Sequence, residues 1–198
     1  FPILQKNLTV QTKGFNPTQY LPEIPTFEIY LDMPQDNLIT GELFAIYSHG
    51  KYNVFLPSEN AVNRDLFSEK NMEYFFSPWF SAYDPTNSRM ALTDDDDKVY
   101  RFVKFGILEM QAKADVFISE SLKKLKIHSQ TRISIGVSVN HDLLQLNLIS
   151  DQINLKQLNE ILSKYDPKKK YYRLKSGEFV DIDENIQALA SFKDAMNL

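Results

Sequence analysis

Apolar residues that alternate with polar ones predict strands in the first third of the chain. Every second side chain over residues 27–33 is apolar, with acidic residues on the other face. That period of two is typical of a half-buried strand. Residues 39–47 and 52–56 carry further apolar runs on either side of a His-Gly pair, and together the three segments predict an antiparallel meander.

A second set of alternating positions predicts a hairpin in the second half of the chain. Apolar and polar residues alternate over residues 133–139 and again over residues 144–148. The segment between them, Asn-His-Asp at residues 140–142, is typical of a turn. Residues 116–119 predict one further short strand.

Apolar residues at helical spacing predict four helices. Residues 63–76 carry the first and residues 93–111 the second, where Thr93 and Asp96 form a capping-box pattern. Asn154 is a favourable N-cap for the third, which Pro167 prevents from continuing. The apolar stripe of this third helix comprises Leu155, Leu158, Ile161, Leu162 and Tyr165.

The most distinctive segment, residues 169–183, reads KKYYRLKSGEFVDID and predicts a hairpin that leads into the fourth helix. Ser176-Gly177 supplies the turn, and Asp183 offers an N-cap to a helix that starts at Glu184. Strand alternation places Tyr171, Arg173 and Lys175 on one face, opposite Tyr172 and Leu174. The stripe of the last helix comprises Ile186, Leu189, Phe192 and Met196.

These patterns predict an α+β fold in which antiparallel meanders and hairpins pack against about four or five helices. Residues 1–26 contain four prolines and predict an extended lead-in, with one edge strand at residues 8–11. Residues 27–198 form the predicted domain, with 27–90 and 91–198 as possible lobes.

Composition narrows the possible classes of function. A chain of 198 residues with 43% hydrophobic and 24% charged residues can bury a substantial core. Its net charge of −4 argues against a dedicated nucleic-acid binder, because phosphate contacts need a basic surface. The absence of cysteine excludes disulfides and thiolate ligands and fits a reducing compartment, so we expect a cytoplasmic protein.

The sequence predicts neither a membrane-spanning helix nor a signal peptide. No apolar run approaches the roughly 20 residues that a membrane-spanning helix needs. The first residues, Phe-Pro-Ile-Leu-Gln, lack the basic start and apolar stretch of a signal peptide. A start at Phe instead of Met suggests a segment excised from a longer protein.

Residues 169–183, together with the upstream run TRISIGVSVNHDLLQLNL at residues 131–148, resemble the helicase-associated domain of bacterial Swi/Snf-type ATPases. The resemblance is strongest over residues 94–198 and weaker over residues 27–56. It implies an accessory domain that precedes an ATPase motor on the same polypeptide, often behind a zinc-binding module. That motor is the implied partner, and ATP and magnesium are expected only there, with no cofactor in this segment.

Three groups of residues resemble functional sites, but their patterns favour structural roles. Four aspartates at residues 94–97 suggest a metal site, but successive helical side chains diverge by about 100°, so a helix start explains them better. The aromatic residues between Tyr74 and Tyr83 suggest a stacking platform, but no Lys or Arg accompanies them, which favours packing. The histidines, His49, His128 and His141, are far apart in sequence and indicate no catalytic or metal constellation.

The densest basic cluster is the candidate site for nucleic acid, and a smaller one comprises residues 123–126. Charge runs are usually solvated, so a plain surface loop is the alternative interpretation of this cluster. Its side chains are Lys168, Lys169, Lys170, Arg173 and Lys175.

The sequence shows neither a nucleophile elbow nor a phosphate-cradling loop, so we expect no catalytic residues in this segment. Two interpretations remain. In one, a non-catalytic accessory domain positions or regulates the ATPase motor of a bacterial Swi/Snf-type DNA helicase or translocase. In the other, a nucleic-acid-binding module recruits that motor through the basic cluster.

Overall fold

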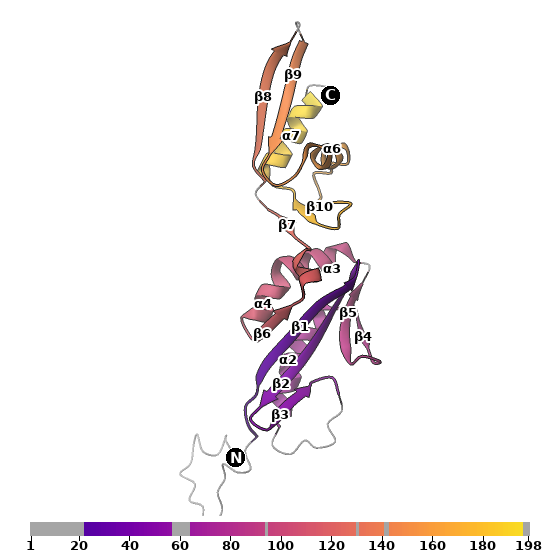
Figure 1. Ribbon diagram of the computed structural model, residues 1–198, viewed down its shortest axis with the longest axis vertical. Coiled ribbons are helices and arrows are strands. Elements are labelled where there is room, and N and C mark those ends of the chain that lie inside the picture. The colour runs from indigo at the N-terminus through magenta and orange to yellow at the C-terminus, as the bar shows by residue number, and fades with distance from the viewer. Residues whose placement is uncertain (1–21, 57–63, 94, 130, 141–142, 196–198) are drawn as a thin grey trace, which may run out of the picture.

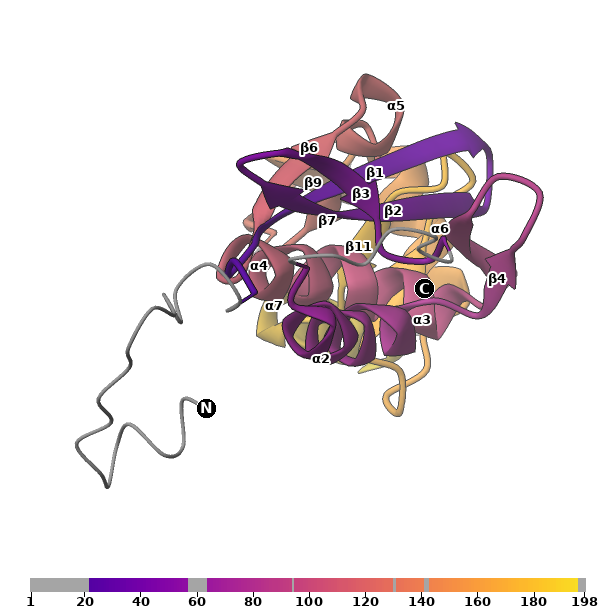
Figure 2. The same cartoon turned by 90° about the horizontal axis from the view of Figure 1, so that it is seen from below.

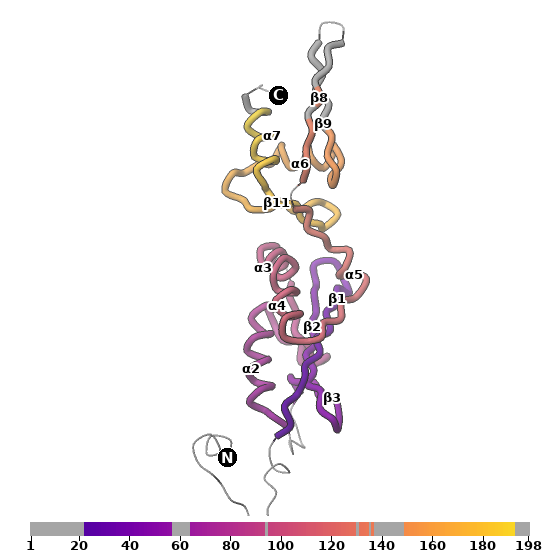
Figure 3. Tube along the Cα trace, turned by 90° about the vertical axis from the view of Figure 1, so that its left-hand side faces the viewer, coloured from indigo at the N-terminus to yellow at the C-terminus, as the bar shows by residue number. Residues whose placement is uncertain are grey.

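The computed structural model packs the chain around two hydrophobic clusters that follow one another along its long axis (Figure 1). The structure describes residues 22–56, 64–93, 95–129, 131–140 and 143–195. The edge strand predicted at residues 8–11 therefore lies outside the described residues, as does most of the predicted lead-in. The chain passes from the first cluster to the second in the segment after α5 (Glu120–Lys123) (Figure 3).

A six-stranded sheet with the order β4-β5-β2-β1-β6 forms one side of the first cluster, and β3 pairs with β2 beside this path. The predicted meander is confirmed for its first two strands. The third strand lies earlier than the predicted 52–56, because the chain turns after Asn53, whose side chain accepts a hydrogen bond from the backbone N–H of Phe55 at 2.9 Å. The strands are β1 (Thr26–Gln35), β2 (Leu38–Tyr47), β3 (Gly50–Asn53), β4 (Ala82–Asp84), β5 (Arg89–Thr93) and β6 (Asp115–Ile118).

The pairing of β5 with β2 overturns one predicted helix start. The capping box expected from Thr93 and Asp96 is wrong, since Thr93 pairs with Leu38 as the last residue of β5. The N-cap is Asp95, whose carboxylate accepts the backbone N–H of Lys98 at 2.9 Å. The strand at 116–119 is confirmed as β6, which runs parallel to β1.

Two helical runs lie together on one side of this sheet (Figure 2). The first is α2 (Leu66–Phe76) with the 3₁₀ turn η2 (Ser77–Trp79), which confirms a helix that ends at Phe76 before Pro78. Phe76 and Phe80 pack so closely over β2 that a Cβ on Gly41 would lie 2.4 Å from a ring carbon of Phe80. Only glycine fits at that position without moving the rings.

The second run combines α3 (Asp96–Arg101), the π-helical turn η3 (Phe102–Gly106) and α4 (Ile107–Gln111). Its end at Gln111 is as predicted, but the π-helical turn was not expected. Phe102, Gly106 and Met110 are buried along it, and Gly106 lies against the indole of Trp79.

The second cluster is built by residues that follow α5, together with the predicted C-terminal hairpin and helix. Its interior residues include Leu158, Ile161, Val180 and Ile186. Part of the predicted 140–142 turn lies outside the described residues. The elements are β7 (Ile127–His128), β8 (Ile133–Asn140), β9 (Leu143–Ser150), α6 (Leu155–Ser163), β10 (Tyr171–Arg173), β11 (Phe179–Asp181) and α7 (Glu184–Ala195).

Both predicted caps in this half are confirmed. Asn154 forms a reciprocal capping box with Gln157, and Asp183 accepts the backbone N–H of Ile186 at 3.0 Å. The predicted stripes are wrong at their edges: Leu155 is 52% exposed and Phe192 is 37% exposed. Leu155 is the first residue of α6 and precedes the buried positions of that helix, and residue 196 is outside the described residues.

The α+β prediction is confirmed. With α3, η3 and α4 counted as one run, the described residues form five helical segments against sheets of mainly antiparallel strands. Two pairings, β1 with β6 and β7 with β11, are parallel and were not predicted. No helix within the described ranges has both the length and the apolar character needed to cross a membrane.

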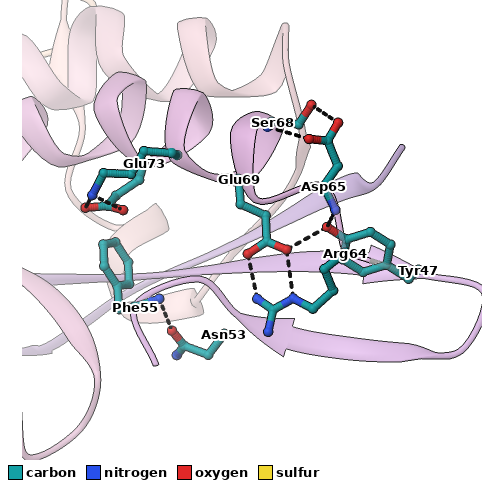
Figure 4. Close-up of polar contacts among 9 residues, drawn as sticks. Tyr47, Asn53, Phe55, Arg64, Asp65, Ser68, Glu69 and Glu73 are labelled. Atoms are coloured by element: carbon teal, nitrogen blue, oxygen red, sulfur yellow. Dashed lines mark hydrogen bonds and ion pairs between the residues drawn. The ribbon is translucent and has the colours of Figure 1, made fainter. Parts of the chain in front are cut away.

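A buried ion pair joins the start of α2 to the sheet (Figure 4). The guanidinium of Arg64 donates to both carboxylate oxygens of Glu69, at 2.9 and 2.5 Å, and the side chains are only 4% and 5% exposed. The hydroxyl of Tyr47 donates to Glu69 at 2.6 Å and accepts the backbone N–H of Asp65 at 3.0 Å. One carboxylate therefore holds a strand, a loop and a helix together.

We expect Glu69→Gln to lower the free energy of unfolding by about 3 kcal/mol, because it leaves the buried charge of Arg64 uncompensated. Urea denaturation of the two proteins measures the difference. The matched control is Glu73→Gln on the same helix, which breaks the more exposed pair with Lys70 and should change stability far less, because solvent screens that pair. Equal effects of the two variants would contradict a central role for the buried pair.

Candidate functional site

The hairpin of β10 and β11 lies between the two hydrophobic clusters and contributes to both. Phe179 is buried in the first cluster and its neighbour Val180 in the second. Tyr171 packs against the first, whereas Tyr172 packs against the second. Successive strand residues point to opposite faces, so a single hairpin serves both sides, and the predicted alternation over this segment is confirmed. We call the boundary between the two clusters the seam.

Asp181 is the centre of the polar contacts in the seam. Its carboxylate accepts hydrogen bonds from the hydroxyl of Tyr100 at 2.5 Å, the ammonium of Lys104 at 2.8 Å and the hydroxyl of Ser129 at 2.6 Å. The side chain is 14% exposed. Burial opposes ionisation, but the three donors outweigh it and hold the pKa of Asp181 below its ordinary value. Burial and the bond to Asp181 raise the pKa of Tyr100.

The acidic start of α3 provides a second set of seam contacts. Tyr171 donates its hydroxyl to Asp97 at 2.6 Å, and its ring stacks on that of Tyr100 with the centroids 4.2 Å apart. Burial, and next the hydrogen bond to Asp97, raise the pKa of Tyr171. Arg173 forms an ion pair with Asp96 and also donates to the side chain of Asn37 in the turn between β1 and β2.

The aspartate run is thus a helix start, as predicted, and also a partner of the hairpin, which was not predicted. Asp95 caps the helix, whereas Asp96 and Asp97 bind the hairpin across the seam. Residue 94 lies outside the described residues. Within the described ranges no three His, Cys, Asp or Glu side chains are grouped as a metal site requires.

Two grooves open along the seam and meet at Arg173, which lines both. The first, the seam groove, has a volume of about 930 Å³ and lies between residues 96–105 and residues 168–173. The second, the turn groove, has a volume of about 640 Å³ and lies between residues 33–37, with α5 beside them, and residues 173–177. Both volumes are in the range of ligand-binding clefts.

Comparison with known proteins identifies the family. A family described as "Bacterial SNF2 helicase associated" matches residues 1–198, the whole chain. The chain belongs to this family. No curated protein and no solved structure matches it. The resemblance carried by residues 131–148 and 169–183 is therefore confirmed, and this SNF2-associated domain is an accessory segment linked with an SNF2 helicase.

The basic residues predicted from the sequence lie together on the seam of the SNF2-associated domain, but they differ in exposure and in ion pairing. Lys168, Lys169 and Lys170 are exposed and line the seam groove. Among the described residues, no carboxylate lies within ion-pair distance of these three ammonium groups. Arg173 is partly buried and paired with Asp96. Lys175 is 83% exposed, lines the turn groove and has its ammonium 4.0 Å from a carboxylate oxygen of Glu160.

Two residues of the seam groove were missed by the sequence reasoning. Arg101 and Phe105 project from the helical run opposite the three lysines. Phe105 is 48% exposed although it lies in an otherwise amphipathic helix. No local pattern joins them to Lys168, because the two walls are more than 60 residues apart in sequence.

The other candidate residues take separate structural positions. Phe76 and Phe80 of the aromatic segment are buried, so its packing role is confirmed for them, but Tyr74 and Tyr83 are exposed. Of the histidines, His49 lies 3.5 Å from a carboxylate of Glu23, and His128 lies 3.6 Å from one of Glu178. His141 lies outside the described residues.

We expect the stability of the domain to fall at acid pH partly through Asp181. Its pKa is depressed in the folded state, so its contribution is complete above the ordinary value of 3.8 and is lost as the pH falls through the folded value. Asp181→Asn should therefore be less stable than the wild type at pH 7, with the difference shrinking towards pH 3. Thermal unfolding across that range measures both trends.

The control for this pH series is Asp115→Asn, at an exposed strand position away from the seam. It should leave the pH profile close to that of the wild type. A difference for Asp181→Asn that stays constant from pH 7 to pH 3 would show that the carboxylate charge is not what stabilises the seam.

Proposed function

We propose that this domain is a non-catalytic accessory unit that positions or regulates the ATPase motor of a bacterial Swi/Snf-type DNA translocase on the same polypeptide. The match of the entire chain to the SNF2-associated family carries the proposal. In it, ATP and magnesium bind in the motor and this domain holds neither.

The outer surface of α2 supports a docking role. Glu69, Met72 and Phe76 are buried on its inner side, whereas Phe67 and Tyr74, two turns apart on the opposite side, are 76% and 67% exposed. Exposed aromatic side chains of this kind are enriched at protein interfaces. A helix that is anchored by the Arg64 ion pair presents them rigidly.

Such a domain changes the rate of a motor only if it contacts one motor conformation more favourably than another. Docking through α2 fits this requirement, because the helix is fixed to the sheet and moves with the entire first cluster. A rigid contact holds a neighbouring unit in one orientation, whereas a flexible tether does not.

DNA-stimulated ATP hydrolysis by the parent protein, compared with a version that lacks this domain, tests the proposal. We expect the deletion to change the maximal rate or the DNA concentration that gives half of it. Motor concentration and salt are held equal, and the folded state of the shortened protein is checked by circular dichroism. An unchanged profile with a folded motor would contradict a regulatory role.

A double variant of the parent protein separates the loss of the α2 docking surface from the general effects of deleting the domain. Phe67→Ser with Tyr74→Ser should reproduce the direction of the deletion, because it removes apolar contact area without touching the core. Leu155→Ser, at an exposed apolar position of α6, is the matched control and should behave like the wild type.

A further inference from the structure

We propose that the seam groove binds a single strand of nucleic acid. Its phosphates would lie along Lys168, Lys169 and Lys170, which we call the lysine wall, and its bases against Phe105 on the helical side, which we call the aromatic wall. This inference goes beyond the proposed function and does not depend on it, because it concerns residues 96–105 and 168–173 instead of the outer surface of α2.

Charge is the first support. The cationic side chains that line the seam groove are Arg101, Lys168, Lys169, Lys170 and Arg173. The turn groove adds Lys124 and Lys175. These seven cations face three carboxylates, so the two grooves carry a formal charge of +4 in a chain whose total is −4. A concentrated basic strip on an acidic chain is the electrostatic footprint of phosphate binding.

The two carboxylates that line the seam groove, Asp96 and Asp97, repel a phosphate chain less than free carboxylates would, because both already have partners. Asp96 is paired with Arg173, and Asp97 accepts the hydroxyl of Tyr171. By contrast, Lys168, Lys169 and Lys170 are exposed. Arg173 thus forms an ion pair across the seam, whereas the ammonium groups of the three lysines face the groove.

Aromatic side chains are the second support and favour a single strand over a duplex. Phe105, Tyr171 and Tyr172 line the same groove as the lysines, and nearly half of the Phe105 surface is open to solvent. Bases of a single strand stack on such rings, whereas bases inside a duplex are already stacked on each other. The seam groove thus holds the two components of such a surface, basic side chains and an exposed ring.

The turn groove extends the same track. Arg173 lines both grooves, so a strand that leaves the seam groove meets Lys175 and then Lys124. Lys124 of the smaller basic cluster and Lys175 of the larger one therefore line one groove, although they are about 50 residues apart in the sequence.

Fluorescence anisotropy with the 198-residue chain tests the proposal directly. The probes are labelled oligo(dT) and oligo(rU) of about 20 nucleotides and a duplex of the same length. We expect single strands to bind more tightly than the duplex at low salt. Preference between oligo(dT) and oligo(rU) tells which single strand the groove takes. Absence of binding to both single strands, or tighter binding of the duplex, would overturn the proposal.

The lysine wall is tested with Lys168→Gln, Lys169→Gln and Lys170→Gln combined. We expect affinity for the single strand to fall by about tenfold or more, and the slope of log K against log salt to become shallower by about 2, since each phosphate contact contributes about 0.7. The control combines Lys70→Gln, Lys113→Gln and Lys156→Gln, which removes equal charge outside both grooves and outside both basic clusters. Equal losses in the two triple variants would show a nonspecific charge effect and overturn the assignment.

The aromatic wall is tested with Phe105→Ala, which should weaken single-strand binding by about fivefold or more while leaving duplex binding unchanged. Leu108→Ala is the matched control: it lies on the same helical run and is 65% exposed, but it does not line the groove. Both side chains are exposed, so neither variant should unfold the domain, which circular dichroism verifies. No effect of Phe105→Ala on a strand that does bind would overturn the stacking arrangement.

Discussion

The position of the β10–β11 hairpin between two hydrophobic clusters is the constraint on which the rest of the structure depends. A short hairpin usually buries one face and leaves the other in water. Here Phe179 completes the first cluster and Val180 the second. Neither cluster is complete without this segment, although it comes late in the chain and most of the first cluster precedes it. The two halves are therefore coupled in stability through a few residues.

Polar contacts then fix the orientation that the apolar contacts permit. The carboxylate of Asp181 gathers donors from two helical residues and a loop, and the acidic start of α3 binds the opposite strand through Tyr171 and Arg173. Hydrogen bonds that involve charged groups are stronger and more directional than neutral ones. The same arrangement separates the basic residues by role, because Arg173 joins the two halves while the neighbouring lysines remain at the surface.

Features with a short sequence period could be predicted, and features that depend on distant pairing could not. Alternation identified β1 and β8, and side-chain chemistry identified the caps Asn154 and Asp183. The sequence did not predict β4 and β5, because β4 has only three residues and β5 ends at Thr93, which the sequence pattern assigned to a helix start. It likewise located the basic side chains but not their groove, since Arg101 and Phe105 reach it only through tertiary packing.

The π-helical turn η3 has a consequence for the tolerated length of the chain. A π-helical turn accommodates one more residue than the same stretch of α-helix, and each residue of an α-helix rotates the next by about 100°. Upstream of η3, Tyr100 faces the hairpin; downstream, Met110 is buried against the sheet. Loss of a single residue between 102 and 106 would turn one of these faces away. This segment therefore tolerates substitutions at its exposed positions far better than any deletion, and relatives that keep both contacts should keep its length.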